Sequence, residues 1–183
     1  QYGKVSVDNT DTGESAGTLN IKNCDEIVFA AEGNTNSALK WWNSGVVNIE
    51  NSTVSARTPN ITATGALNLV GSEFSTSSTA ITNAGTITMD AASKITATDI
   101  AGDGEVAIDA TGFTGTKTVI DVDSTTTLTN NKLTVTGSDY KRSSGDVILV
   151  NVGDVESGTL YVNTDWTSQD AIDAVMGELS GYE

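Results

Sequence analysis

Gly65-Ala66-Leu67-Asn68-Leu69 and, twenty residues later, Gly85-Thr86-Ile87-Thr88-Met89 share one pattern, a glycine followed by alternating apolar and polar residues. Further copies stand at Gly17–Ile21, Gly45–Ile49 and Gly104–Ile108, with a weaker copy at Lys132–Val135. The successive glycines are 28, 20, 20 and 19 residues apart. A recurring period of this size is typical of solenoid proteins, in which each repeat is one coil stacked on its neighbours.

Aligning the copies produces three apolar columns in each repeat. The first lies four residues before the glycine (Trp41, Ile61, Ile81, Ile100 and Leu128), and the second lies two and four residues after it. The third lies nine or ten residues after it (Ile27, Val54, Phe74, Ile95 and Phe113) and ends at Tyr140. Period-2 alternation between turn residues predicts three short strands per repeat, each with one buried face. We therefore predict an all-β parallel β-helix with coils of about twenty residues. An antiparallel β-sandwich is the alternative, although it needs no repeat in register.

The layout predicted from these patterns is a single domain over residues 1–183. It has an N-terminal cap (1–16), repeat coils (17–140), final strands (141–166) and a short capping helix (167–183). The apolar run Gly145–Val152 indicates a strand buried on both faces. The helix is indicated by apolar residues at helical spacing after a polar N-cap: Ala171, Ile172, Val175, Met176 and Leu179. Two long repeats contain the insertions Glu32–Lys40 and Thr114–Asp123, which we expect to be loops on one face.

Composition narrows the function classes. The 183 residues carry a formal net charge of −15, which argues against nucleic acid and anionic membranes as partners. The chain contains no apolar run long enough for a membrane span and no signal-peptide pattern. An acidic β-rich chain with one cysteine is typical of exported bacterial proteins, so we expect an extracellular or cell-surface location. Cys24 has no partner for an internal disulfide and lies between Ile21 and Ile27, as a small turn or core residue would.

The absence of histidine excludes Ser-His-Asp and Cys-His catalysis and His-ligated zinc. Paired carboxylates are the remaining route to glycoside hydrolysis, and the candidate pairs are Asp121/Asp123 and Asp99/Asp103. Both pairs lie in turn-rich segments, where aspartate hydrogen-bonds its own backbone. Gly102–Ala107 resembles a phosphate loop but opens a strand instead of a helix. We expect no catalytic residues, no metal ligands and no cofactor.

Trp42 is the one candidate ligand-binding residue. The alignment places Trp41 in the inward column, so Trp42 is expected to point outward beside the insertion Glu32–Lys40. An exposed tryptophan can stack on a glycan or anchor a host or cell-surface protein. Packing of Trp42 beneath the insertion is the alternative.

The phrase Ala80–Met89, which contains Ile-Thr-Asn-Ala-Gly-Thr-Ile-Thr, resembles the repeats of autotransporter passenger domains and filamentous-haemagglutinin-type adhesins. The resemblance covers Gly17 to about Tyr140 in degenerate form. It implies an exported right-handed β-helix used as a stalk or adhesive surface, without shared catalytic residues. We therefore expect a non-catalytic scaffold or adhesin domain. A polysaccharide-binding or polysaccharide-degrading β-helix protein is the alternative, and a trimeric phage tail-fibre segment is a third possibility.

Overall fold

The computed structural model describes residues 6–7, 17–29, 42–76, 79–125, 127–128 and 132–151. The chain divides into two compact units, residues 1–153 and 154–183, and the described residues all belong to the first. They form β-strands and turns without any helix, and so contain no helix that could cross a membrane. The predicted capping helix, the insertion Glu32–Lys40 and most of the predicted N-terminal cap lie outside the described residues.

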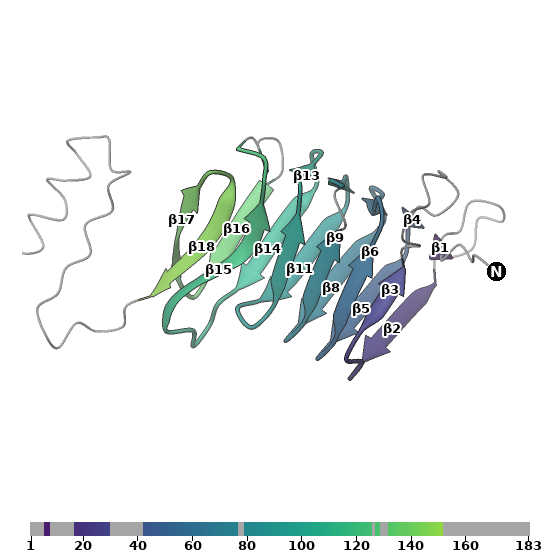
Figure 1. The fold of residues 1–183 in the computed structure, drawn as a ribbon, viewed down its shortest axis with the longest axis horizontal. Helices are drawn as coiled ribbons and strands as arrows, with labels where there is room; N and C mark the ends of the chain where they lie inside the picture. Colours follow the sequence, from purple (N-terminus) through teal and green to yellow (C-terminus); the bar gives the residue numbers. More distant parts are fainter. Residues whose placement is uncertain are drawn as a thin grey trace, which may run out of the picture. The chain divides into compact units, whose positions relative to one another are not determined.

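The strands form three sheets, and in Figure 1 they lie side by side along the stack. Sheet A contains β1 (Ser6–Val7), β4 (Trp42–Asn43), β7 (Asn60–Ile61), β10 (Ile81–Asn83) and β13 (Ile100–Ala101). Sheet B contains β2 (Thr18–Lys22), β5 (Val46–Glu50), β8 (Ala66–Val70), β11 (Thr86–Asp90), β14 (Glu105–Asp109) and β16 (Lys132–Thr136). Sheet C contains β3 (Ile27–Phe29), β6 (Thr53–Ala56), β9 (Glu73–Thr76), β12 (Lys94–Ala97), β15 (Gly115–Val122), β18 (Asp146–Asn151) and β17 (Asp139–Ser143). From β1 to β15 the chain visits sheets A, B and C in turn. We call three such consecutive strands a structural repeat.

The predicted all-β fold with parallel sheets is confirmed. In sheet B each strand pairs in parallel with the strand of the next repeat, so Ile87 lies between Leu67 and Val106 in register. These three side chains are at most 1% exposed and belong to one continuous hydrophobic cluster. The parallel pairing rules out the antiparallel sandwich. Burial of alternate residues in neighbouring strands explains why an apolar residue returns at the same position of each repeat.

In sheet A, the predicted first column is correct for Ile81 and Ile100, which are register partners, but wrong for Ile61. Ile61 pairs with Asn83, two residues farther along β10. The cause is an additional turn, closed by a 2.8 Å hydrogen bond from Gly65 N to Thr62 O, between β7 and β8. Between register partners, the step from Ala56 to Ile61 is two residues shorter than the step from Thr76 to Asn83 in the next repeat, so the glycine spacing of twenty conceals the shift.

The third column is also confirmed only in part. Register pairs join Ile27, Val54, Phe74 and Ile95 as predicted, but the next partner of Ile95 is Ile120 instead of Phe113. The predicted loop Thr114–Asp123 is therefore mostly strand β15. A loop was expected because Phe113 has the column spacing, whereas sheet pairing selects the β-branched run around Ile120.

Sheet C ends in an antiparallel hairpin, which the sequence did not predict. β18 pairs antiparallel with both β15 and β17, so Tyr140 is opposite Leu149 and is 43% exposed instead of continuing the third column. The apolar run in β18 is buried on one face only. Val147 and Leu149 are fully buried, whereas Ile148 and Val150 are half-buried.

The repeat glycine has a packing role. A Cβ atom on Gly85 would lie 2.2 Å from Gly65 O and 2.3 Å from Thr62 O, and one on Gly104 would lie 2.4 Å from Gly85 O. Such distances are far inside van der Waals contact. At Gly85 and Gly104, the corner before sheet B thus brings the backbones of adjacent repeats too close for a side chain.

Candidate functional site

The outward face of sheet B carries a ladder of side-chain hydrogen bonds. Asn48 Nδ2 donates to Asn20 Oδ1 and Asn68 Nδ2 donates to Asn48 Oδ1, both at 2.8 Å. Thr88 Oγ1 then donates to Asn68 Oδ1 at 2.6 Å. These residues share one register position in four adjacent strands, and stacking of identical amides is a recurrent device in parallel sheets. The ladder uses hydrogen-bonding capacity that a ligand would otherwise engage.

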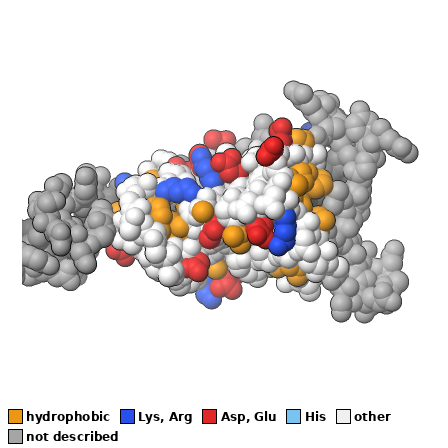
Figure 2. Space-filling model, turned by 90° about the horizontal axis from the view of Figure 1, so that it is seen from below, with side chains coloured by type: hydrophobic (Ala, Val, Ile, Leu, Met, Phe, Trp, Pro, Cys, Tyr) orange, Lys and Arg blue, Asp and Glu red, His pale blue; other side chains and the backbone are white. Residues whose placement is uncertain are grey.

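Charged side chains on the same face are joined across strands. Lys22 Nζ lies 2.5 Å from Glu50 Oε2, and Lys132 Nζ lies 3.1 Å from Glu105 Oε1. In the view of Figure 2, acidic and basic side chains are interspersed among uncharged ones. Exposed pairs of this kind add little stability, but they leave these carboxylates neutralised by a neighbour.

A second ladder lies at the buried corner between sheets B and C. Cys24 N donates to Ser52 Oγ at 3.0 Å, and Ser52 N and Ser72 N donate to the hydroxyls of Ser72 and Ser93 at 3.1 Å. The three serines are at most 5% exposed. Cys24 therefore occupies the serine position of its repeat, and its thiol donates to Lys22 O at 3.4 Å. Cys24 was expected to be a small turn or core residue, and it is partly buried against the core at this corner.

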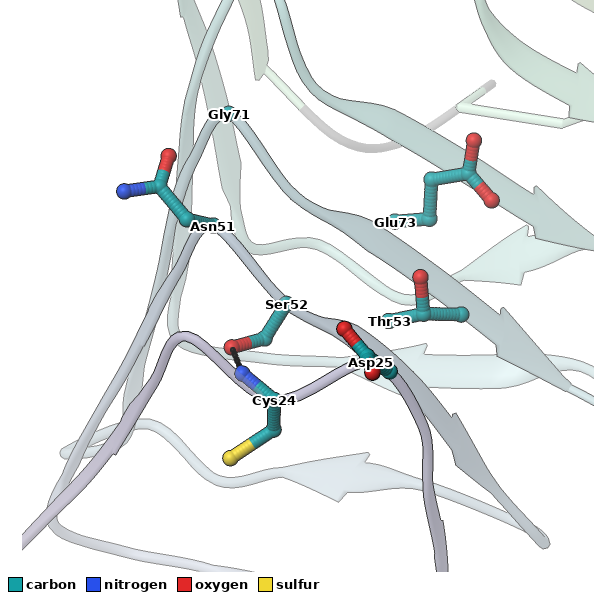
Figure 3. A pocket seen from close by; sticks show the side chains of 7 residues that line it. All are labelled: Cys24, Asp25, Asn51, Ser52, Thr53, Gly71 and Glu73. Atoms are coloured by element: carbon teal, nitrogen blue, oxygen red, sulfur yellow. Dashed lines mark hydrogen bonds between the residues drawn. The ribbon is translucent and has the colours of Figure 1, made fainter.

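A shallow depression of about 390 Å³ opens above this corner. Its lining comes from three successive repeats: Cys24, Asp25, Asn51, Ser52, Thr53, Gly71 and Glu73. In Figure 3 the Glu73 carboxylate points away from the hydrogen bond between Cys24 and Ser52. Within the described residues, no three His, Cys, Asp or Glu side chains are grouped closely enough to hold a metal ion. The depression thus presents two separate exposed carboxylates instead of a convergent site.

In each candidate carboxylate pair, one aspartate hydrogen-bonds to a side chain outside the pair. Asp121 Oδ2 accepts a hydrogen bond from Lys94 Nζ at 2.7 Å, and Asp99 Oδ1 accepts one from the Thr127 hydroxyl. Asp103 and Asp123 are exposed. A glycosidase requires one of two carboxyls to stay protonated beside the other. Asp121 and Asp99 instead each contact a lysine or threonine side chain of another repeat.

The structure places the Trp42 backbone in sheet A, in register with Ser6 and Asn60. Asn60 is in turn in register with Thr82, whose side chain is exposed, which puts the Trp42 backbone in the outward-facing row of its sheet. The Trp42 side chain and the insertion beside it lie outside the described residues. Trp42 remains the candidate for ligand contact.

One acid outside the candidate pairs has a perturbed pKa. Asp109 stands at the end of β14, and the Thr111 side chain and Thr111 N–H both hydrogen-bond its carboxylate, the latter at 2.9 Å. These bonds lower the pKa of Asp109 because they favour the charged form. The arrangement is a local turn at a strand end, and we assign it no chemical role.

Sequence reasoning missed both ladders. The signal for the corner ladder was present in Asn23-Cys24, Asn51-Ser52 and Gly71-Ser72, which recur after the same strand, but such pairs also mark ordinary turns. No protein-family model, curated protein or solved structure matches the chain.

Proposed function

We propose that the chain is a right-handed parallel β-helix that serves as a non-catalytic scaffold or adhesin domain of an exported bacterial protein. Parallel pairing between strands three apart in the chain supports the helix, with about twenty residues per coil in the middle repeats. The right hand follows from the strong preference of parallel crossover connections. The apolar spacing in residues 167–183 supports the predicted C-terminal helix.

One observation carries the functional proposal. On the outward face of sheet B, polar side chains are bonded to each other along the stack, as in the ladder from Asn20 to Thr88. An enzyme site requires the opposite arrangement, in which polar groups converge on a space left for substrate. A surface whose polar groups hydrogen-bond to each other suits a stalk, which must remain folded in an exposed environment.

The proposal is tested first by a search for catalysis. The purified chain is incubated with a panel of acidic and neutral polysaccharides, and new reducing ends are measured. We expect none above the buffer blank. Turnover that is lost in Asp121→Asn or Asp99→Asn would instead establish a polysaccharide-degrading protein.

Binding is tested on glycan and host-protein arrays. We expect binding of any ligand to be lost in the Trp42→Ala variant and retained in the Tyr140→Ala variant. The second variant is the control, because it removes an exposed aromatic residue elsewhere in the fold. Binding that survives Trp42→Ala would move the contact surface away from β4. Export is tested by treating intact cells of the organism that produces the protein with a protease. A domain on the cell surface is cleaved although the cells are not lysed.

A further inference from the structure

The two ends of the strand stack have different edge strands. At one end the edge of sheet C is β17, Asp139-Tyr140-Lys141-Arg142-Ser143, whose charges discourage pairing with another strand. At the other end sheets B and C finish at β2, Thr-Leu-Asn-Ile-Lys, and β3, Ile-Val-Phe. Among the described residues, neither β2 nor β3 has a strand on its outer side. The backbone groups on that side of β2 can accept a further strand.

The hydrophobic core is less well covered at this end than in the interior repeats. Leu19, Ile27 and Phe29 are only half-buried and pack against the core from its margin. Their register partners in the next repeat, Val47, Val54 and Ala56, are fully buried. Another layer placed against β2 and β3 would bury this apolar surface, which is favourable in proportion to its area.

The amide ladder has a direction that ends at β2. Asn68 donates to Asn48 and Asn48 donates to Asn20, so each amide serves the repeat nearer the N-terminus. Asn20 Oδ1 accepts from Asn48, whereas Asn20 Nδ2 has no acceptor among the described residues. A primary amide has two N–H donors and two acceptor lone pairs. Asn20 therefore presents both a donor and a second lone pair at the edge, the combination that another amide complements.

We propose that β2 pairs antiparallel with β2 of a second copy of the chain, about a twofold axis at Asn20. Asn20 is the central residue of the five in β2, so the two Asn20 amides lie opposite each other and exchange hydrogen bonds. Leu19 of each copy then lies opposite Ile21 of the other copy, so inward apolar residues meet on both sides of the axis. Thr18 faces Lys22, and no two like charges are opposed.

A second copy satisfies every requirement of this edge. The occupant must be an extended strand with apolar residues at two inward positions and an amide at the outward position between them, and β2 has that sequence itself. A twofold axis also closes the assembly, because each edge is used once. Each copy carries a formal charge of −15, so repulsion opposes association and salt should strengthen it.

Sedimentation equilibrium and site-directed cross-linking test the dimer together. In a Cys24→Ser background, which introduces the residue found at that corner in the next repeats, Asn20→Cys places two thiols opposite each other. Opposed residues of antiparallel strands have Cα atoms about 4.5–5.5 Å apart, within the disulfide range. Asn68→Cys is the matched control, because it belongs to the same ladder but lies between β5 and β11.

We expect a monomer–dimer equilibrium whose dimer fraction rises with salt. Oxidation should cross-link Asn20→Cys at least tenfold more than Asn68→Cys, and Asn20→Lys should weaken dimerisation at least tenfold while far-UV circular dichroism stays unchanged. A chain that is monomeric at all concentrations and salt levels would overturn the proposal. Protected amides of Thr18, Asn20 and Lys22 in that monomer, measured by hydrogen exchange, would show that the chain's own residues cover the edge, because these amides point away from β5. Equal cross-linking at both positions would also overturn it.

Discussion

Asn83 is the register partner of Ile61 in sheet A and occupies the same inward position. Counting from the repeat glycines predicts Ile81 at this place instead, because Ile81 and Ile61 both lie four residues before a glycine. Asn83 is fully buried, and its Nδ2 donates to Glu105 O at 3.2 Å. The backbone bond from Gly104 N to Asn83 O, at 3.0 Å, fixes the same residue to the following repeat. The Asn83 side chain thus adds a second connection from β10 to the next repeat, which an isoleucine at the same place could not make.

The inward and outward assignment in sheet B predicts unequal effects for neighbouring substitutions. Ile87→Asp should lower the free energy of unfolding by more than about 3 kcal/mol, because it buries an unpaired carboxylate between Leu67 and Val106. Thr88→Asp adds the same charge on the outward face and should cost about 1 kcal/mol or less. Urea denaturation midpoints of the two variants give the comparison. Equal losses would show that the two faces are misassigned.

The close approach of repeats predicts that Gly85 tolerates no side chain. Gly85→Ala should destabilise the protein by at least about 2 kcal/mol, since its Cβ would overlap the backbone carbonyl oxygens of Gly65 and Thr62, which both accept backbone hydrogen bonds. Gly17→Ala is the control, because nothing lies within 4 Å of a Cβ there. Thermal unfolding should show a large loss for Gly85→Ala alone. A stable Gly85→Ala protein would mean that adjacent backbones separate easily.

The amide ladder predicts a graded loss along sheet B. Asn48→Ala removes two hydrogen bonds, one donated to Asn20 and one accepted from Asn68, and should cost about 1–2 kcal/mol. Thr88→Val keeps the shape of its side chain and removes one bond, so about half that cost is expected. Denaturant unfolding measures both. A Thr88→Val loss as large as that of Asn48→Ala would indicate that the bonds do not contribute one by one.

The corner ladder predicts different tolerances along its length. Serine should be required for stability at the interior positions, whereas serine and cysteine should be interchangeable at position 24, where the ladder ends. Ser72→Ala leaves the buried Ser52 N–H without its acceptor and should cost about 2 kcal/mol. Cys24→Ser restores the residue used in the following repeats and should change stability by less than about 0.5 kcal/mol. Hydrogen exchange at the Ser52 amide is the direct measurement, and faster exchange is expected only in Ser72→Ala.

The lowered pKa of Asp109 predicts a small acid-sensitive contribution to stability. A group whose folded pKa is depressed stabilises the fold above its unfolded pKa, and this contribution is lost as the pH falls through the folded pKa. Thr111→Val removes the hydroxyl but keeps the N–H donor, so the Asp109 pKa should rise only part of the way to its ordinary value. Carboxyl carbon NMR titration of both proteins measures the shift. An unchanged titration curve would assign the effect to the backbone donor alone.

Local sequence determined the strand content of this protein. Alternation in segments such as Leu67-Asn68-Leu69 allows only a strand with one buried face, and the returning glycine marks the corner where repeats meet. Because residues of equal offset come to lie side by side, the columns in sheet B could be predicted from spacing alone. The functional candidates could not be developed as far, because an outward residue such as Trp42 leaves no periodic signal.

Tertiary structure decided the features that depend on which strands become neighbours. Two compensating connections moved Ile61 beside Asn83 without altering the glycine spacing, and no counting of residues reveals such a shift. Ile120 replaced Phe113, and β18 entered sheet C antiparallel, because hydrogen-bond pairing selects among several apolar segments of similar local character. The sequence by itself thus determined the alternation and the period, which are local properties. Register and strand order arise only when distant backbones compete for the same partners.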